Sequence, residues 1–374
     1  MKRSFIREIL EAINKDTISF AGGLPDAKLF PIKQLKKATS KITTDTNTWQ
    51  YSTSNGLKEL REKIAKRYTK DGFKTNAENI LITTGSQQAL YIIARCFENN
   101  NITIESPSYI GAMNSFKLNH LTLDSVKLRD NGIDKKGFEK SIKNSKLTYL
   151  IPDFQNPSGK TYSDKKRKQL STIIKKNGAI LIEDSPYSDI YFTKKHKSIS
   201  SYIPNNSFHL GSFSKTLSPS LRIGYIRASE ELISKLLIIK ESIDLHSCGI
   251  SQNILNEYLS KPKRLDKHLK TLQNSYKDKM EYFCDCLDEK LPQFKYTKPK
   301  GGMFIYGEFE NIDVYKLLEK CMENNVVFVP ADEFLIEGKN KRAIRFNYTN
   351  SSFKEIKKGI TKISNIINTD QLRF

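Results

Sequence analysis

Short apolar runs that suit β-strands alternate with helix-like stretches through the middle of the chain. Between about residues 79 and 228 these runs are "NILITT", "NITIE", "LTYLI", "AILIE", "SFHLGS" and "IGYIRA", and the first four are separated by helical patterns. Such alternation is typical of a mostly parallel, buried sheet with helices on its faces. The last two runs are too close for a crossover helix, so one of them is predicted to pair antiparallel. The sequence therefore predicts an α/β domain.

The last third of the chain has a different pattern. From 230 to about 290 it is helical, and "GGMFIYGEF", "VVFVP" and "AIRFNY" then predict three more strands. One helix is expected over 313–324, between the first two strands, and another after the third. These elements predict a second, smaller α+β domain.

The N-terminus is predicted to join that smaller domain. Residues 5–13 place isoleucine and leucine on one helical stripe, and Ser4 could cap the helix. We expect an N-terminal arm over 1–45, a large domain over 46–275 and a small domain over 276–374.

The net charge of +21 could indicate a polyanionic partner, since clustered basic residues release counterions from nucleic acid. The basic residues are spread along the whole chain, however, and only 13 of the 62 are arginine. The densest runs, "SDKKRKQL" and "TKKHKS", contain no aromatic residues for base stacking. We therefore expect a solvated basic surface and no nucleic-acid partner.

Other function classes also fit poorly. No stretch of 18 uncharged apolar residues occurs, and acidic residues interrupt the first apolar turns, so neither a membrane span nor a secretory signal is expected. The five cysteines are scattered, without a C-x-x-C pair or a histidine at ligand spacing. This argues against a disulfide framework or a metal site. We expect a cytoplasmic protein without a metal.

The run "TTGSQQAL" (83–90) follows one predicted strand and opens a helix. Free N–H groups and the helix dipole favour a phosphate at such a place, and Ser86 and Gln87 would add side-chain donors. A plain turn with Gly85 at the bend is the alternative. The run "NPSGKT" is not a P-loop, because Phe154 stands where that motif needs a glycine.

Two further strand ends carry ionisable residues. Asp184 ends "AILIED" with Tyr187 three residues later, and Lys215 follows "FHLGSFS". Each has an ordinary alternative, a loop-capping aspartate and a solvated lysine. If the sheet is parallel, both would meet the Asn156 turn and the phosphate-type helix start in one crevice. A desolvated lysine can form a Schiff base, and a phosphate site beside an aspartate suggests pyridoxal phosphate (PLP).

These residues resemble a known family, the PLP-dependent fold-type I aminotransferases of class I/II, and within it the kynurenine/2-aminoadipate (LysN-type) branch. The matching blocks occur in the family's order over nearly the whole chain: "ISFAGGLPDAKLFP", "YSTSNG", "ITTGSQQAL", "ESPSYIGA", "PDFQNPSG", "IEDSPY", "GSFSKTLSPSLRIGY", "KPKGGMF" and "IRFNY". The resemblance implies a large, mostly parallel seven-stranded-type sheet domain and a smaller α+β domain. It also implies exchange of an amino group between an L-amino acid and a 2-oxo acid such as 2-oxoglutarate.

The resemblance also implies roles for single residues around the cofactor ring. Lys215 would form the Schiff base with PLP and shuttle a proton. Asp184 would keep the pyridine nitrogen protonated, Tyr187 and Asn156 would hydrogen-bond the ring hydroxyl, and Tyr109 would stack on the ring. The phosphate would be bound by Ser86, Gln87, Ser212, Ser214 and Arg222, and by Tyr51 of the other subunit, which implies a homodimer with shared sites.

Further residues would bind substrate. Arg345 is placed like the arginine that pairs with the substrate α-carboxylate, with Asn156 assisting. Gly22 and Gly23 would line the pocket by close backbone approach. Arg7 matches an arginine that grips a distal carboxylate, although it could equally be a polar residue on the flank of an amphipathic helix. Four departures from the usual family pattern leave substrate preference open: Ser158, Pro186, Ser220 and Asn347.

Two alternatives stay open beside transamination. Members of this fold also run β-lyase, cyclase or oxidase reactions on PLP. The same fold also serves as the effector-sensing part of bacterial transcription regulators. We expect no DNA-binding domain here, because "ISFAGGLP" begins at residue 18. Aminoadipate, kynurenine, aromatic and branched-chain amino acids are all candidate substrates.

Overall fold

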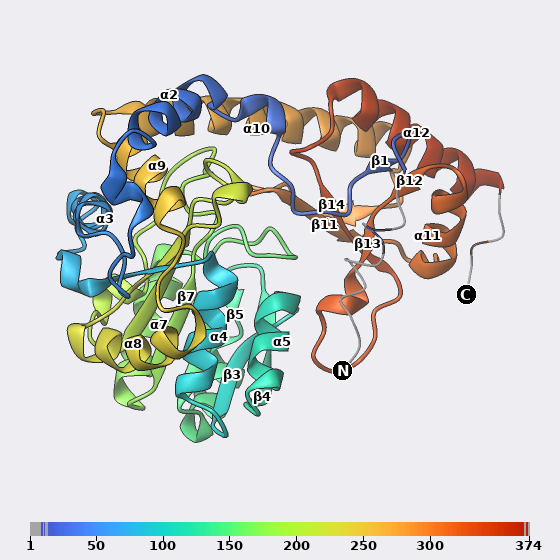
Figure 1. Ribbon diagram of the computed structural model, residues 1–374. Coiled ribbons are helices and arrows are strands. Elements are labelled where there is room, and N and C mark those ends of the chain that lie inside the picture. Colours follow the sequence, from blue (N-terminus) through green and yellow to red (C-terminus); the bar gives the residue numbers. More distant parts are fainter. Residues whose placement is uncertain (1–8, 10, 12–13, 370–371, 373–374) are drawn as a thin grey trace.

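The computed structural model describes residues 9, 11, 14–369 and 372. The predicted helix over 5–13, with its cap Ser4, falls almost entirely outside the described residues. Two sheets organise the rest, and the long helix α10 (Arg264–Lys290) runs along both parts of the molecule (Figure 1). The predicted domain border at 275/276 lies inside this helix, and the division into domains stays a prediction.

The larger sheet has eight strands in the order β2-β9-β8-β7-β6-β3-β4-β5. Their bounds are β2 Ile80–Thr83, β3 Asn101–Ser106, β4 Thr122–Arg129, β5 Gly132–Ile133, β6 Leu147–Leu150, β7 Ile180–Asp184, β8 Ser207–Ser212 and β9 Gly224–Arg227. Strands β4, β3, β6, β7 and β8 are parallel, and β9 pairs antiparallel with both β8 and β2. The predicted α/β sheet is confirmed, and β9 is the strand of the last two runs that pairs antiparallel. Strand β5 also pairs antiparallel, with β4. The carboxyl ends of β2, β6, β7 and β8 therefore lie at the same edge.

The strands of this sheet are apolar because helices cover both faces. Tyr149 and Ile182 pack into a cluster with α4 (Ser86–Cys96) and α8 (Glu230–Asp244). Leu150, which follows Tyr149, and Leu181, which precedes Ile182, pack on the other face with α6 (Lys135–Ser141) and α7 (Asp164–Lys176). Alternate side chains thus enter different clusters, as the period of a strand requires. Two further helices are α3 Lys58–Lys70 and α5 Ile110–Leu118.

The sequence analysis missed β4 and β5. Strand β4 carries Asp124, Lys127 and Arg129, and its side chains alternate between exposed and half-buried at its start. It lies near the sheet edge, where only the two-residue strand β5 pairs with its outer side. A strand that is partly solvated lacks the continuous apolar run by which the others were found.

The second part of the molecule is built on a four-stranded antiparallel sheet in the order β10-β11-β14-β13. The predicted helices are confirmed as α11 and α12, but "VVFVP" is divided between two short strands in different sheets. Strand β1 reaches over from the N-terminal side to pair with β12 in parallel. The bounds are β1 Ile18–Ser19, β10 Lys295–Tyr296, β11 Phe304–Glu308, β12 Val326–Val327, β13 Val329–Pro330, β14 Ala343–Asn347, α11 Val314–Glu323 and α12 Phe353–Thr369.

Helices from distant parts of the chain lie side by side at one end of the molecule (Figure 1). Helices α2 (Ile32–Ile42) and α9 (Gly249–Leu259) pack together beside α10 (Figure 1). A single cluster of buried residues runs from Ile82 of β2 through Tyr276 of α10 to Phe346 of β14. This cluster therefore connects the two sheets, and it is separate from the two clusters under the helices of the large sheet. No helix among the described residues is long and apolar enough to cross a bilayer.

Candidate active site

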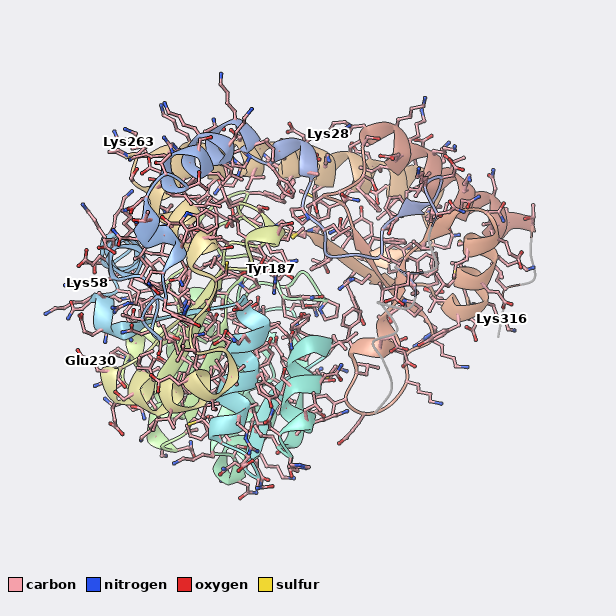
Figure 2. All side chains as sticks on the ribbon, viewed as in Figure 1. Lys28, Lys58, Tyr187, Glu230, Lys263 and Lys316 are labelled. Carbon is pink, nitrogen blue, oxygen red and sulfur yellow. The ribbon has the colours of Figure 1, made fainter. Side chains whose placement is uncertain are left out.

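The carboxyl edge of the large sheet faces the small one, and the predicted site residues gather there. Tyr187 stands between the two parts of the molecule (Figure 2) and makes an edge-to-face contact with Phe304 of β11, with ring centroids 5.8 Å apart. Asp184 ends β7, Lys215 follows β8 and Asn156 follows β6. Strands β6, β7 and β8 are parallel neighbours, so their carboxyl ends lie side by side.

Lys215 is held against the N-terminal segment. Its Nζ donates a hydrogen bond to the Gly23 carbonyl at 2.8 Å. Burial lowers the pKa of Lys215 to about 8, and the charges of Arg345 and Arg222 act in the same direction. A Cβ on Gly23 would lie 3.3 Å from the Phe304 ring and 3.8 Å from this Nζ, so a side chain there would crowd the amine. The lysine is therefore an amine that loses its proton unusually easily.

This lowered pKa predicts a stability cost that depends on pH. Below pH 8 the amine is protonated in both states, and the folded state bears the cost of burying the charge. Between pH 8 and about 10.5 the folded amine is neutral while the unfolded one still binds its proton, so stability rises with pH. Lys215→Met should therefore be more stable than wild type at pH 7, by an amount on the order of 3 kcal/mol. That gap should shrink as the pH rises through this window.

Urea unfolding of the cofactor-free protein at pH 7, 8.5 and 10 measures the gap. Lys136→Met serves as the control, because Lys136 is exposed. A gap that stayed constant over this pH range would contradict the assignment.

Asp184 is buried, and among the described residues only one of its two carboxylate oxygens has a hydrogen-bond partner. Its Oδ2 accepts a hydrogen bond from the Tyr149 hydroxyl at 2.8 Å, whereas Oδ1 is buried and has no partner among the described residues. Burial raises the pKa of Asp184 to about 6, with Tyr149 opposing the shift. The group is still mainly a carboxylate at neutral pH. A buried carboxylate oxygen without a donor is costly, so this atom suits a ligand that brings an N–H group.

Arg345 is a buried cation in the same crevice. Its Nη1 donates to Asn156 Oδ1 at 2.9 Å and its Nη2 donates to the Ala21 carbonyl, whereas Nε has no partner among the described residues. The guanidinium lies 4.4 Å from the centroid of the Phe304 ring. Burial lowers its pKa to about 10, which leaves it charged at neutral pH. No carboxylate in the described part of the chain pairs with it, so an anionic ligand would complete this environment.

Tyr187 and Asn156 complete the centre of the crevice. Both are buried, and Asn156 donates a hydrogen bond to the Tyr187 hydroxyl. Burial raises the pKa of Tyr187, so its hydroxyl keeps its proton. Asn156 therefore connects this hydroxyl with the guanidinium of Arg345.

A second end of the crevice is suited to phosphate. Helix α4 begins after Gly85, which has φ 81°, and no side chain of its N-cap residue bonds its first N–H groups. Arg222 lies beside this turn and donates to Ser214 Oγ and to the Thr84 carbonyl, at 3.4 and 3.3 Å. A Cβ on Gly85 would come within 2.5 Å of Arg222 Nη2. Free N–H groups, a hydroxyl and a guanidinium together form an anion site.

The other predicted phosphate residues lie around this turn. Ser86 is the first residue of α4, and Ser212 Oγ accepts a hydrogen bond from the Ser214 N–H at 3.1 Å. The Gln87 amide donates to the Gly111 carbonyl and accepts from the Tyr109 hydroxyl, so the group that it can offer to a phosphate is its backbone N–H. Tyr109 itself directly precedes α5.

Two predicted residues have a different setting. Tyr51 is 80% exposed, and its ring lies edge-on to His246. An exposed tyrosine at this place is available to another molecule. Arg7 lies outside the described residues.

Comparison with known proteins decides the family. The family described as Aminotransferase class I and II matches residues 15–363. The chain belongs to the class I and II aminotransferases. The LysN-type branch is supported by a crystal structure of LysN, the α-aminoadipate aminotransferase of Thermus thermophilus, complexed with N-(5'-phosphopyridoxyl)-L-leucine. It has 31% identity and a TM-score of 0.91, covering 98% of this chain and 95% of that one.

Other relatives of this aminotransferase include proteins named as enzymes and proteins named as regulators. Aromatic-amino-acid aminotransferase 1 of Thermococcus litoralis is 34% identical over 98% of this chain and 92% of its own length. The HTH-type transcriptional regulator NorG of Staphylococcus aureus is 32% identical over 90% of this chain and 77% of its own length. Sequence similarity alone therefore includes both enzymes and a regulator.

Sequence reasoning missed three contributors to the aminotransferase site. Tyr149 supplies the hydrogen bond to Asp184, the Ala21 carbonyl accepts from Arg345, and Phe304 packs on Tyr187. Tyr149 offered one signal, a phenolic hydroxyl in a buried strand. The other two act through a backbone oxygen and a ring face, which no motif identifies.

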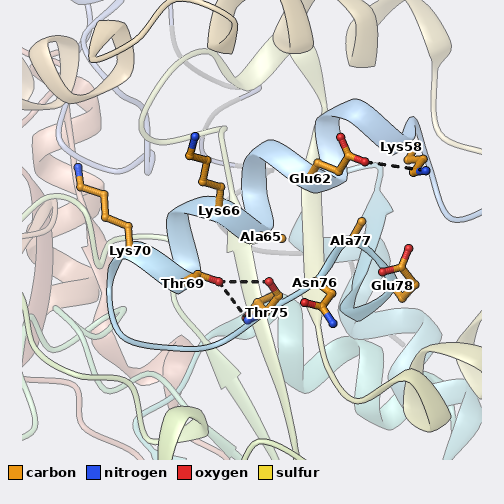
Figure 3. A pocket seen from close by; sticks show the side chains of 10 residues that line it. All are labelled: Lys58, Glu62, Ala65, Lys66, Thr69, Lys70, Thr75, Asn76, Ala77 and Glu78. Carbon is orange, nitrogen blue, oxygen red and sulfur yellow. Dashed lines mark hydrogen bonds and ion pairs between the residues drawn. The ribbon is translucent and has the colours of Figure 1, made fainter.

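A hollow of about 740 Å³ lies away from this site, between α3 and residues 75–78 (Figure 3). It is wide open, and its lysines extend from one face of α3. Lys58 forms an ion pair with Glu62 at 4.0 Å. The Thr75 N–H donates a hydrogen bond to the Thr69 hydroxyl. None of the residues that the aminotransferase fold gathers at the strand ends lines it. We interpret it as a solvated helix face.

Proposed function

We propose that this aminotransferase uses PLP to move an amino group between an L-amino acid and a 2-oxo acid such as 2-oxoglutarate, in a ping-pong cycle. The observation that carries the proposal is the unpartnered, buried Oδ1 of Asp184 at the end of β7, next to the strand that leads to the easily deprotonated amine of Lys215. A protonated pyridine nitrogen would supply the missing donor. The residues present therefore fit this cofactor.

PLP supplies an aldehyde that condenses with amines and a ring that takes up the electron pair released at the substrate Cα. Asp184 would hold the ring nitrogen protonated, since its carboxylate is ionised at neutral pH. Tyr187 and Asn156 would bind the ring hydroxyl, and Tyr109 would stack on the ring. Lys215, once free, would carry the proton away from Cα and return it, a task suited to an amine with a pKa of about 8.

The phosphate would lie at the start of α4. Ser86 and Gln87 would contribute N–H groups, Ser212 and Ser214 hydroxyls, and Arg222 its guanidinium. Tyr51 would complete this site from the partner subunit of a homodimer, in keeping with its exposure. Light scattering should then report twice the chain mass, and a monomer that kept full activity would contradict the shared site.

Arg345 would bind the substrate α-carboxylate, with Asn156 assisting. Arg345→Lys keeps the charge but removes the planar fork, so the loss should fall on substrate binding. We expect the KM of the amino donor to rise roughly 10–100-fold, with a smaller change in kcat. Steady-state kinetics measure this split. Arg342→Lys, at an exposed position three residues earlier, is the matched control, and equal effects of the two variants would contradict the role.

The substrate side chain is the open part of the proposal. Gly22 and Gly23 would line its pocket, and the close contacts around Gly23 leave little room for a larger residue there. Relatives act on α-aminoadipate and on aromatic amino acids, so we propose donors of these kinds, with kynurenine and branched-chain amino acids as further candidates. A panel of donors with 2-oxoglutarate, run on wild type and Arg7→Ala, tests this. Loss confined to dicarboxylic donors would support a distal-carboxylate role for Arg7, and equal losses for all donors would refute it.

Simple measurements distinguish the proposed transamination from two other functions. Similarity to NorG favours a regulator as the second candidate, and specific gel-shift binding at physiological salt without transamination would establish it. A β-lyase, cyclase or oxidase would consume the amino acid without stoichiometric transfer of its amino group to 2-oxoglutarate. A cytoplasmic location without a membrane or nucleic-acid partner remains part of the proposal.

A further inference from the structure

Asp244, the last residue of α8, is tied to the phosphate end of the crevice although no motif pointed to it. Its Oδ1 accepts a hydrogen bond from Lys240 Nζ at 2.6 Å, and Lys240 is completely buried. Its Oδ2 accepts from Gln88 Nε2 at 2.7 Å. Both carboxylate oxygens of Asp244 therefore accept a hydrogen bond from a side chain.

Gln88 links Asp244 to the turn before α4. Its Oε1 accepts a hydrogen bond from the Thr84 N–H at 2.7 Å. Because the amide nitrogen faces Asp244, the amide oxygen must face Thr84, so the carboxylate decides which end of the amide meets the backbone. The Thr84 hydroxyl also lies 3.4 Å from Asp244 Oδ2 and 3.3 Å from Ser247 Oγ. The backbone and the side chain of Thr84 are thus both held in place.

Thr84 in turn meets the predicted phosphate ligands. Its carbonyl accepts from Arg222 Nη2 at 3.3 Å, and it directly precedes Gly85, after which α4 begins. Helix α8 also ends sharply here, since Leu245 adopts φ 56°, a conformation uncommon for leucine. Backbone strain of this kind persists where neighbouring contacts hold it in place.

We infer that Asp244 is a positioning residue for the cofactor phosphate: it orients Gln88, which fixes the Thr84–Gly85 turn and with it the N–H groups of α4 and the guanidinium of Arg222. The inference rests on the proposed PLP function. It concerns only the phosphate end, because none of these contacts reaches Asp184 or Lys215. Loss of Asp244 should therefore weaken binding of the phosphate and leave binding of the ring unchanged.

Comparison of PLP with pyridoxal, which lacks the phosphate, tests the inference. The full-length chain freed of cofactor is titrated with each ligand, and absorbance reports binding. Asp244→Asn should raise the Kd of PLP about tenfold, the effect of losing one charge-assisted hydrogen bond, and leave the Kd of pyridoxal unchanged. Glu241→Gln, at an exposed position of the same helix, should match wild type for both ligands.

A second variant guards against misfolding, because Asp244→Asn also leaves Lys240 buried without its carboxylate. Gln88→Leu keeps that ion pair and removes both hydrogen bonds of the Gln88 amide, to Asp244 and to Thr84. It should show the same selective loss of PLP. Equal losses for both ligands, or no loss for either, would overturn the positioning role while the proposed function stands. A wild-type chain that binds neither ligand would overturn the proposed function and the inference with it.

Discussion

Lys215→Ala is expected to lower transamination by about 10⁴-fold, the largest effect of any single substitution in this chain. The variant loses the amine that would attach to the cofactor aldehyde and also the base that would move the Cα proton. The amine of Lys215 is held at this place by its hydrogen bond to the Gly23 carbonyl. Single-turnover measurements with saturating PLP and donor would give the rate.

Lys136→Ala is the control, since this lysine is exposed on the surface. It should match wild type. Lys215→Ala should also regain part of its rate when a small primary amine is added, because the missing base is then supplied from solution. A Lys215→Ala protein within about tenfold of wild type would show that the chemistry takes place elsewhere.

Asp184→Asn is expected to lower kcat/KM about 10³-fold with the fold intact. The amide is nearly the same size and can still accept from Tyr149, but it no longer supplies the negative charge that would keep the ring nitrogen protonated. Tyr149→Phe is the matched variant. It removes one hydrogen bond from the carboxylate and keeps the charge, so a loss of only about tenfold is expected. Similar losses in the two variants would show that the charge of Asp184 is not what matters.

The fold could be predicted in large part because most strands of the large sheet are covered on both faces. Because they are buried, Ile80–Thr83, Leu147–Leu150 and Ile180–Asp184 consist mostly of apolar residues. Strand β4 was not predicted because exposed charged residues interrupt its apolar pattern. The division of "VVFVP" into two strands depends on partners far away in the chain, Ile18 for one strand and Arg345 for the other.

The sequence was enough to predict which residues come together in the site. Lys215, Asp184 and Asn156 all follow strand ends, and parallel strands bring such ends together. The sequence could not show the polar partners of each group. Arg345 bonds the Ala21 carbonyl across 324 residues of chain, and Asp244 reaches Gln88 across 156. Backbone acceptors and amide orientations of this kind exist only once the packing is known.

The central claim is that Lys215 is the residue to which PLP attaches. Purified protein is incubated with PLP, reduced with borohydride to fix any imine as a stable amine, digested, and analysed by mass spectrometry. The account predicts one pyridoxyl group per chain on the peptide that contains Lys215, and its loss when a good amino donor is added before reduction. Labelling spread over exposed lysines, with Lys215 unmodified, would contradict it.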